Sequence, residues 1–529
     1  MTELQGGRQG LWTAGMYLAV LAAAAIVFAP VCRFNFVYWD DLELVVQNPQ
    51  LHPPTLQNLG AFWTAPYERL YTPAAYSLWW MLSRLCGGVT DASAFHAANL
   101  LLHLFAVALV FSILRTCIRW DWAALAGTLL FAVHPLQVEA VAWVSGMNNL
   151  LAAVFCLAAI RLYLEFARRA SADRWAFYAG ATLAFLLALL AKPTAVAAPL
   201  MAAVLDVAIL RRRIAKVAVS ILPWLCAAAV LAILTSRLQP TPPATPILQR
   251  PAVALDALAF YLWKLLWPMR LSIDYVRTPM RIWQSRQWIG GAAAVAAVAA
   301  AIGMGRSRRA GGLGLGLAVL IAGLLPVLGL FAFDFQRYST VADRYMYLAM
   351  LGAALMLAWT ANRWPTLALA AVVGAAICLL AWRSEMQLRN WKNTDALVAH
   401  TLQLDPLSTV GNKILAFQRA RQQRWQEAAA LYRTALIRNP QDGDVLYNLA
   451  NALSKGGDPL GAIDEYQRAI PLLEPARRLS AMNNLGIAYF DAGQEERAEN
   501  EFLAVLQIDP QNAHARKNLA LITIGVPRD

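Results

Sequence analysis

The sequence predicts an all-α protein in two parts: a membrane domain of about eleven spanning helices, then a soluble array of helical repeats. The chain has 529 residues, is 59% hydrophobic and has a mean hydropathy of +0.46. Soluble domains seldom reach such values, because their surface must be polar. Apolar stretches of about 20 residues, long enough to cross a bilayer, recur up to residue 390. From residue 391 to the end these stretches stop and short motifs repeat.

The basic residues predict the topology of the membrane domain, residues 1–390. They lie in short clusters between apolar stretches, as cytoplasmic loops do under the positive-inside rule. The clusters are Arg115 and Arg119; Arg168, Arg169 and Arg174; Arg211, Arg212, Arg213 and Lys216; and Arg306, Arg308 and Arg309. The net charge of +13 therefore reflects the basic residues of the predicted cytoplasmic loops. It does not indicate nucleic-acid binding, since no basic face or tail is present.

The expected spans alternate in direction, and this alternation places every basic cluster on the cytoplasmic side. They are 11–30, 95–114, 121–143, 148–167, 175–191, 193–210, 217–236, 287–304, 311–332, 343–361 and 364–382. Residues 31–94 form the first external loop. Within it, "YTPAAYSLWWMLSRLCG" suits a helix lying at the membrane surface. We expect "FYLWKLLWPMRLSIDY" (260–275) to be interfacial or re-entrant and to break at Pro268. The N-terminus is then cytoplasmic, and residues 391–529 lie outside the cytoplasmic (inner) membrane.

The region 391–529 shows the tetratricopeptide (TPR) pattern. "LQLDP", "LIRNP" and "LQIDP" recur, and prolines close successive units at Pro406, Pro440, Pro475 and Pro510. Ala428, Ala462 and Ala498 occupy one register, where neighbouring helices cross. We expect three repeats and a trailing helix at 512–523. Such an α-solenoid presents a groove to a peptide or protein and has no catalytic chemistry of its own. A dimerisation or folding module is the alternative.

An acidic pair, Asp40 and Asp41, stands in "FNFVYWDDLEL" just after the first span. Adjacent side chains of an extended chain point to opposite sides, so the two carboxylates can serve two purposes. One can accept a proton from a hydroxyl as a general base. Its neighbour can orient the acceptor or hold a divalent cation, Mg²⁺ or Mn²⁺, although the sequence leaves the cofactor open. A helix cap or an acidic pair that solvates the interface is the structural alternative.

Further ionisable residues fall at the outer ends of the spans. They are His134, Glu139, Lys192, Arg270, Asp274, Asp334, Arg337, Asp343 and Arg344. Charged groups at membrane depth are costly and usually functional. Together they predict one outward-facing cavity, with cations for a phosphate and carboxylates for an acceptor hydroxyl. Arg270 and Arg337 could instead be interface anchors.

Several of these motifs occur in a familiar order. "YWDD", "FHAANLLLH", "LFAVHPLQVEAVAWVSGMNNLLA", "YLWKLLWPMRLSIDY" and "ADRYMYL", followed by TPR units, resemble the transmembrane-and-TPR protein O-mannosyltransferases. More broadly the chain is similar to the GT-C superfamily of glycosyltransferases. The resemblance covers nearly the whole chain, and the Ala-rich composition suggests a bacterial version.

This resemblance implies a polyprenyl-phosphate donor carrying one sugar and inverting transfer to Ser/Thr of exported proteins. Asp40 would be the base, and Asp41 would position the acceptor or a metal ion. Arg344 and Lys192 would stabilise the departing phosphate. His134, Arg337 and Arg270 would complete the donor side, and Glu139 and Asp343 the acceptor side.

The resemblance also assigns the partners and leaves some questions open. The TPR groove would hold the acceptor protein beside the membrane lipids. Mannose is only an analogy, because the "YW" before the acidic pair and the "KPT" at Lys192 depart from the animal sequences. A lipid or surface-glycan acceptor and a non-enzymatic TPR scaffold remain alternatives, and a transporter is a fourth. Eleven spans with charged outer ends are more than a scaffold needs.

Overall fold

A computed structural model describes residues 2–68, 70–236, 245–304 and 311–524. These residues are helical, with one isolated bridge between Tyr67 and Leu70 and no β-strand among them, which confirms the predicted class. The chain divides into two compact units, Met1–Leu397 and Val398–Asp529. We call them the membrane unit and the repeat unit. The predicted basic cluster at Arg306, Arg308 and Arg309 lies outside the described residues.

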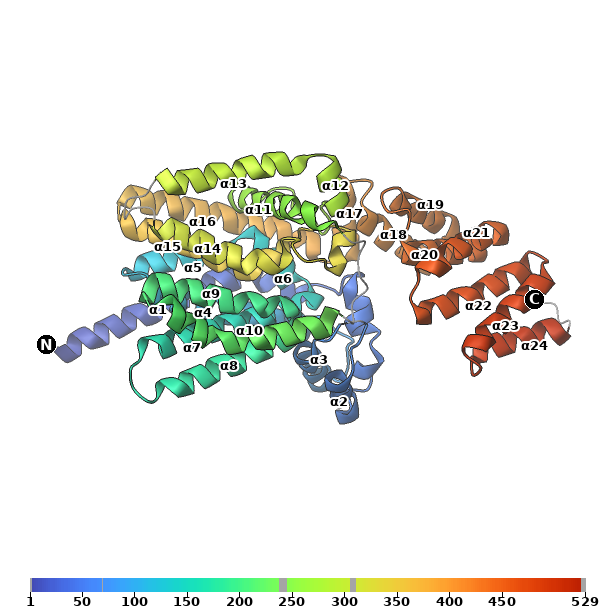
Figure 1. Ribbon diagram of the computed structural model, residues 1–529, viewed down its shortest axis with the longest axis horizontal. Coiled ribbons are helices and arrows are strands. Elements are labelled where there is room, and N and C mark those ends of the chain that lie inside the picture. Colours follow the sequence, from blue (N-terminus) through green and yellow to red (C-terminus); the bar gives the residue numbers. More distant parts are fainter. Residues whose placement is uncertain (1, 69, 237–244, 305–310, 525–529) are drawn as a thin grey trace. The chain divides into compact units, whose positions relative to one another are not determined.

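The membrane unit contains sixteen α-helices among its described residues (Figure 1). They are α1 (Thr2–Phe28), α2 (Leu56–Thr64), α3 (Pro73–Cys86), α4 (Ser93–Cys117), α5 (Asp121–Val133), α6 (Val138–Ala142), α7 (Met147–Arg168), α8 (Arg174–Ala191), α9 (Ala198–Leu205), α10 (Ile214–Ser236), α11 (Arg250–Leu266), α12 (Pro279–Gln284), α13 (Gln287–Met304), α14 (Gly311–Leu324), α15 (Met346–Arg363) and α16 (Leu367–Leu388).

The apolar helices follow the predicted spans. In the part of the chain that the structure describes, eight are long and apolar enough to cross a membrane. The bent pair α5–α6 makes a ninth, and two shorter apolar helices lie at Gln287–Ala300 and Gly312–Val327. Each overlaps one predicted stretch. Large apolar side chains are exposed on these helices, for example Phe105 (62%), Val219 (73%) and Val372 (65%). Exposed apolar surface of this kind marks contact with lipid.

Two predicted segments differ from the structure in form. The stretch 121–143 is not one straight span, because α5 and α6 meet at a 49° bend. Pro135 causes this, since proline cannot continue the hydrogen bonding of the preceding helix. In the segment 260–275, α11 already ends at Leu266, two residues before Pro268. Helix α3 occupies the segment expected to lie at the membrane surface.

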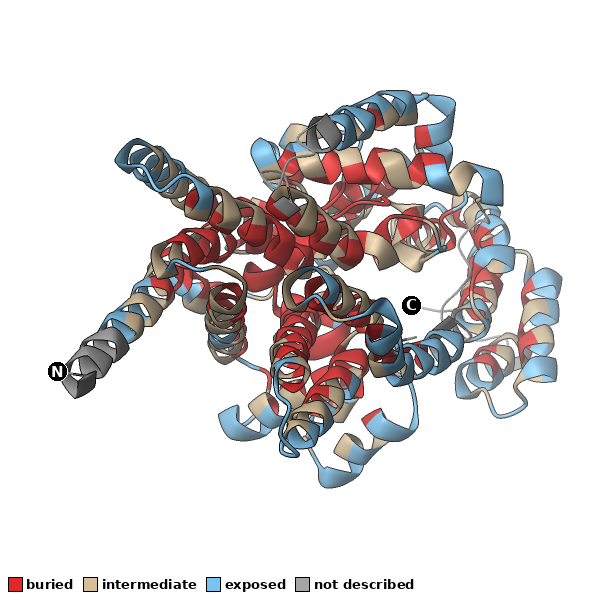
Figure 2. Ribbon diagram, turned by 60° about the vertical axis from the view of Figure 1, so that its left-hand side comes forward, coloured by how far each residue is buried: buried red, intermediate tan, exposed pale blue. Residues whose placement is uncertain are grey.

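Small residues bring the central helices of the membrane unit close together. A Cβ atom on Gly352 of α15 would lie 2.4 Å from the carbonyl oxygen of Gly316 on α14. Only glycine permits this approach, and small residues serve the same purpose in other membrane bundles. Buried residues gather towards the centre of the helix bundle (Figure 2). The tight α14–α15 pair fixes the segment that precedes α15, which carries part of the site.

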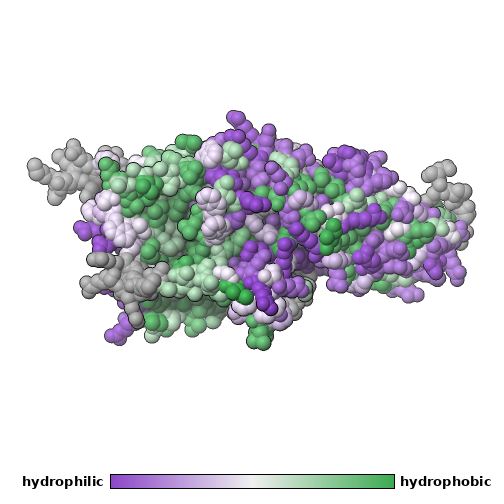
Figure 3. All heavy atoms as spheres, turned by 90° about the horizontal axis from the view of Figure 1, so that it is seen from above, coloured by the Kyte–Doolittle hydropathy of each residue, from purple (hydrophilic) through white to green (hydrophobic). Residues whose placement is uncertain are grey.

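The repeat unit consists of antiparallel helix pairs. Helix α17 (Thr394–Leu404) crosses the boundary, and then follow α18 (Thr409–Arg421), α19 (Trp425–Leu436), α20 (Gly443–Lys455), α21 (Pro459–Ala469), α22 (Pro475–Asp491), α23 (Glu495–Ile508) and α24 (Ala513–Ile524). Ala428, Ala462 and Ala498 are fully buried, as expected for residues at helix crossings. The three pairs and the trailing helix match the predicted repeats. The surface of this unit is largely hydrophilic, whereas apolar residues cover wide areas of the membrane unit (Figure 3).

Candidate functional site

The acidic pair lies in a helical turn, not in extended chain as predicted. The chain leaves α1 through the 3-10 helix η1 (Ala29–Arg33), and Asp40 and Asp41 open a turn that leads into η2 (Leu42–Val46). Asp41 has helical torsion angles, with φ −60° and ψ −35°. Successive side chains of a helix diverge by about 100°. The two carboxylates therefore still face different surroundings.

Asp41 is fully buried and fully engaged. Its Oδ2 accepts the Val37 N–H at 3.0 Å, and its Oδ1 accepts the N–H and the hydroxyl of Ser145 at 2.8 and 2.6 Å. Burial raises the pKa of Asp41 to about 6, although these hydrogen bonds oppose the shift. Because Ser145 lies between α6 and α7, Asp41 anchors the acidic turn to the helix bundle.

Asp41 does not fit the metal-ligand role that the sequence left open. Its hydrogen bonds occupy both carboxylate oxygens. A Mg²⁺ or Mn²⁺ ion would need several further oxygen ligands. The described residues contain no group of three His, Cys, Asp or Glu side chains that could share an ion.

Asp40 is partly buried. Its charge acts on Lys192 and on Arg344, which places it within electrostatic reach of both. Glu139 shares in both interactions. Of the two predicted carboxylates, Asp40 is therefore the one with a reactive environment.

Arg344 lies at the centre of the site, in the 3-10 helix η11 (Asp343–Tyr345). Its guanidinium pairs with Glu139 of α6, and its backbone N–H donates to the same carboxylate at 3.0 Å. Both side chains are buried, at 7% and 2% exposure. The guanidinium also lies against aromatic rings, with Phe335 at 4.3 Å and Trp39 at 5.4 Å. These contacts hold the arginine in one orientation.

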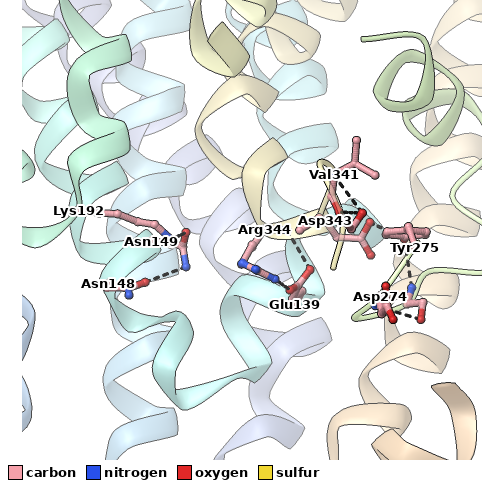
Figure 4. Close-up of polar contacts among 12 residues, drawn as sticks. Glu139, Asn148, Asn149, Lys192, Asp274, Tyr275, Val341, Asp343 and Arg344 are labelled. Carbon is pink, nitrogen blue, oxygen red and sulfur yellow. Dashed lines mark hydrogen bonds and ion pairs between the residues drawn. The ribbon is translucent and has the colours of Figure 1, made fainter. Parts of the chain in front are cut away.

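Lys192 approaches from the junction of α8 and the 3-10 helix η6 (Pro193–Ala197) (Figure 4). Its Nζ donates to Asn149 Oδ1 at 2.5 Å, and Asn149 in turn donates to Asn148 Oδ1 at 2.9 Å. Burial lowers the pKa of Lys192 to about 7, while Glu139 and Asp40 act in the opposite direction. Sequence reasoning missed the two asparagines. The sequence does contain a signal for them, because two neighbouring amide side chains at the start of an apolar helix are candidates for a polar site.

A small pocket in the interior of the bundle borders this site. One end is polar, with Asn149 and Arg344. The remainder is mainly apolar and lies among α7, η6, α14 and α15; its lining includes Ala152, Ala153, Cys156, Ala195, Val327 and Leu348. Such a site suits a ligand with an anionic head and a hydrocarbon body.

Three of the other predicted site residues do not join this group, whereas Asp343 lies beside it. Both ring nitrogens of buried His134 contact the backbone, with Leu265 O at 3.1 Å and Leu136 N at 3.2 Å, so none is left for a phosphate. Arg337 pairs with Asp334 at 2.5 Å. Arg270 is exposed. Asp343 accepts the Tyr275 hydroxyl at 2.7 Å (Figure 4) and lies within electrostatic reach of Glu139 and Arg344.

The expectation of one cavity for all these charges is therefore corrected. The structure brings together Asp40, Glu139, Lys192 and Arg344. Asp343 adjoins this group and is hydrogen-bonded to Tyr275. Sequence position alone does not show which of the predicted charges belong to the group.

Comparison with known families identifies the repeats. Two tetratricopeptide repeat models match residues 419–477 and 479–512. Among solved structures, YrrB, a TPR protein with an unusual peptide-binding site, is 24% identical and covers 28% of this chain and 73% of its own, with a TM-score of 0.23. The first TPR of Spaghetti (RPAP3) bound to an HSP90 peptide is 21% identical and covers 22% and 91%, with a TM-score of 0.21. Scores this low carry no argument about function.

Curated relatives are similar to part of the chain. Protein O-mannosyl-transferase Tmtc2 of Drosophila melanogaster is 36% identical over 197 residues, which are 35% of this chain and 21% of the relative. Protein O-mannosyl-transferase TMTC3 of Homo sapiens is 32% identical over 145 residues, or 25% and 15%. The match thus spans about a fifth of these relatives. The chain combines apolar helices with tetratricopeptide repeats and is similar to proteins named protein O-mannosyl-transferases.

Proposed function

We propose that this chain is a membrane glycosyltransferase of GT-C type that moves one sugar from a polyprenyl-phosphate donor to Ser/Thr hydroxyls of exported proteins. One observation carries the proposal: Arg344, within electrostatic reach of Asp40, lines a mainly apolar pocket together with Asn149, the hydrogen-bond partner of Lys192. The names of the relatives support protein O-mannosylation, and we propose mannose as the sugar on that ground.

In this proposal the two ends of the donor bind at the two ends of the pocket. Arg344 and Lys192 face the phosphate, and the apolar residues of α7 and α15 receive the start of the prenyl chain. Negative charge grows on the phosphate as its bond to the sugar breaks. Fixed cations beside it, in a site that excludes water, lower the barrier. The Glu139 contact keeps Arg344 in place for this purpose.

Asp40 then acts on the acceptor. Its carboxylate takes the proton of the Ser or Thr hydroxyl as that oxygen attacks the anomeric carbon. The carbon–oxygen bond to the phosphate breaks at the same time, and polyprenyl phosphate leaves from the opposite face. The product has inverted configuration at that carbon. Asp41 takes no part in the proton transfer and keeps Asp40 in position through Ser145.

The proposed topology puts this reaction on the outer side of the cytoplasmic membrane. It rests on the basic clusters between the apolar stretches, which favour a cytoplasmic N-terminus. Under this topology residues 391–529 are external too, and the groove of the repeats binds a segment of the acceptor protein. The membrane domain of 1–390 and its first external loop, 31–94, then carry the catalytic chemistry.

Mass spectrometry of exported proteins tests the proposal. Cells carrying the wild-type chain are compared with cells carrying Asp40→Asn, at equal protein level. Asp91→Asn is the control, because Asp91 is an exposed aspartate in the same external loop. We expect hexose-sized adducts on Ser/Thr peptides to vanish in Asp40→Asn alone. Unchanged adducts would contradict the role of Asp40. A change confined to lipids or surface glycans would show that the acceptor is not protein.

A further inference from the structure

The segment that enters the repeat unit is hydrogen-bonded to the acidic turn. The Tyr38 N–H donates to Thr394 Oγ1 at 2.9 Å, across 356 residues of sequence. The Asn35 N–H donates to the carbonyl oxygen of Lys392 at 3.0 Å. Thr394 is 6% exposed and begins α17. All four residues belong to the membrane unit, so these contacts lie within one compact body.

These bonds fix the backbone directly before Asp40. Between Asn35 and Asp41, the Val37 N–H donates to Asp41 and the Trp39 N–H to the Val37 carbonyl, both local contacts. The bonds to Lys392 and Thr394 join this stretch to the segment before the repeat unit, and at its other end Asp41 accepts from Ser145. The Tyr38–Thr394 bond is partly buried, and its loss removes the side-chain bond that ties this stretch to α17. The Asn35–Lys392 bond and the contacts of Asp41 would remain.

Aromatic rings reinforce the same connection. Trp39 stacks on Trp143 with the ring centres 4.8 Å apart and the planes at 12°. Trp143 also lies beside Trp391, with centres 6.3 Å apart. Trp391 is only 2% exposed. The residue before Asp40 is thus packed, through one intermediate ring, against the segment that carries Thr394.

We propose that Thr394 is a positioning residue for sugar transfer, which holds Asp40 against the donor through the Tyr38 amide. This inference rests on the proposed function, and its role is distinct from that of Asp40, since Thr394 acts only through the backbone. A base displaced by a fraction of an ångström still permits binding but slows the reaction. The loss should therefore appear in kcat and not in the donor KM.

The test compares variants of the full chain in lipid vesicles. Thr394→Val removes the hydroxyl at nearly constant volume, and Thr394→Ser restores it. Thr128→Val is the control, because Thr128 is an equally buried threonine whose hydroxyl bonds to the Ala124 carbonyl of its own helix. We measure kcat and the donor KM with mannosyl-phosphoryl-polyprenol and a Ser/Thr-rich peptide. Amide exchange of the 35–41 segment is measured on the same samples.

We expect Thr394→Val to lower kcat about fivefold, the equivalent of one hydrogen bond of about 1 kcal/mol. The donor KM of Thr394→Val should stay within about twofold of wild type. Thr394→Ser and Thr128→Val should match wild type in kcat and KM. Only Thr394→Val should show faster amide exchange in the 35–41 segment. Unchanged kcat in Thr394→Val, or an equal loss in Thr394→Ser, would overturn the proposal. If wild type transfers no sugar, the proposed function fails, and amide exchange alone tests whether Thr394 holds the 35–41 segment. Equal exchange of this segment in Thr394→Val and wild type would then reject that role of Thr394.

Discussion

Breaking the buried Glu139–Arg344 pair should destabilise the membrane unit strongly. Glu139→Gln keeps the shape of the side chain but removes its charge, and the guanidinium remains at 7% exposure without its counter-ion. Removing one partner of a buried pair costs about 3–5 kcal/mol. An unfolding entropy of roughly 2.1 cal/mol/K per residue, over the 397 residues of the unit, gives about 0.8 kcal/mol/K. The melting temperature should therefore fall by about 4–6 °C.

Thermal unfolding of the full chain in lipid nanodiscs measures this change. Glu385→Gln is the matched control: it breaks an i,i+4 pair with Arg389 whose side chains are 53% and 66% exposed. Exposed pairs contribute about 0–1 kcal/mol, so the control should melt within about 1 °C of wild type. Adding Arg344→Met to Glu139→Gln should recover at least half of the lost stability, because no unpaired charge is then buried. Equal melting of Glu139→Gln and Glu385→Gln would refute the reasoning.

Three further predictions concern the carboxylates and Lys192. Asp40→Asn should slow transfer by about 10²–10⁴-fold with little change in melting temperature. Asp41→Asn should instead destabilise the unit by about 1–3 kcal/mol, because the new amide NH₂ must face a hydrogen-bond donor. Transfer assays and melting curves distinguish the two effects. Burial raises the pKa of Asp41 to about 6, so between about pH 4 and 6 the folded state binds a proton that the unfolded state has lost. Stability should therefore fall as pH rises through that window. Melting curves of wild type should show this trend, and those of Asp41→Asn should show it more weakly. Burial lowers the pKa of Lys192 to about 7, so transfer should decline above pH 7 as the ammonium loses its proton. In Lys192→Arg the pH–rate profile should no longer show this decline. A decline that persists unchanged in Lys192→Arg would count against a role for Lys192.

The sequence predicts the helices well because their signals are local. Apolar stretches of span length and a 34–35-residue repeat are each visible within a short window of the chain. The break at Pro135 was also a local signal, since proline interrupts helices, but the long apolar context outweighed it in the prediction of one span. The extended form expected for Asp40 and Asp41 failed because "WDDLELVV" folds into a helical turn.

The site could be predicted only in part, because its contacts join distant segments. Asp40, Lys192, Arg344 and Glu139 were identified from their residue types at the outer ends of spans. The burial of Asp41 depends on Ser145, which is 104 residues away and carries no distinguishing motif. The same holds for Thr394, 356 residues from Tyr38.

Transfer by the purified chain tests the central claim most directly. Wild type and Asp40→Asn are placed in vesicles with radiolabelled mannosyl-phosphoryl-polyprenol and a Ser/Thr-rich peptide, and label on the peptide is measured over time. The account predicts labelled peptide with wild type and at most about a hundredth of that rate with Asp40→Asn. Equal labelling by both proteins would contradict the assignment of Asp40 as the base. No labelling by wild type, with this donor or with other polyprenyl-phosphate sugars, would contradict the proposed activity itself.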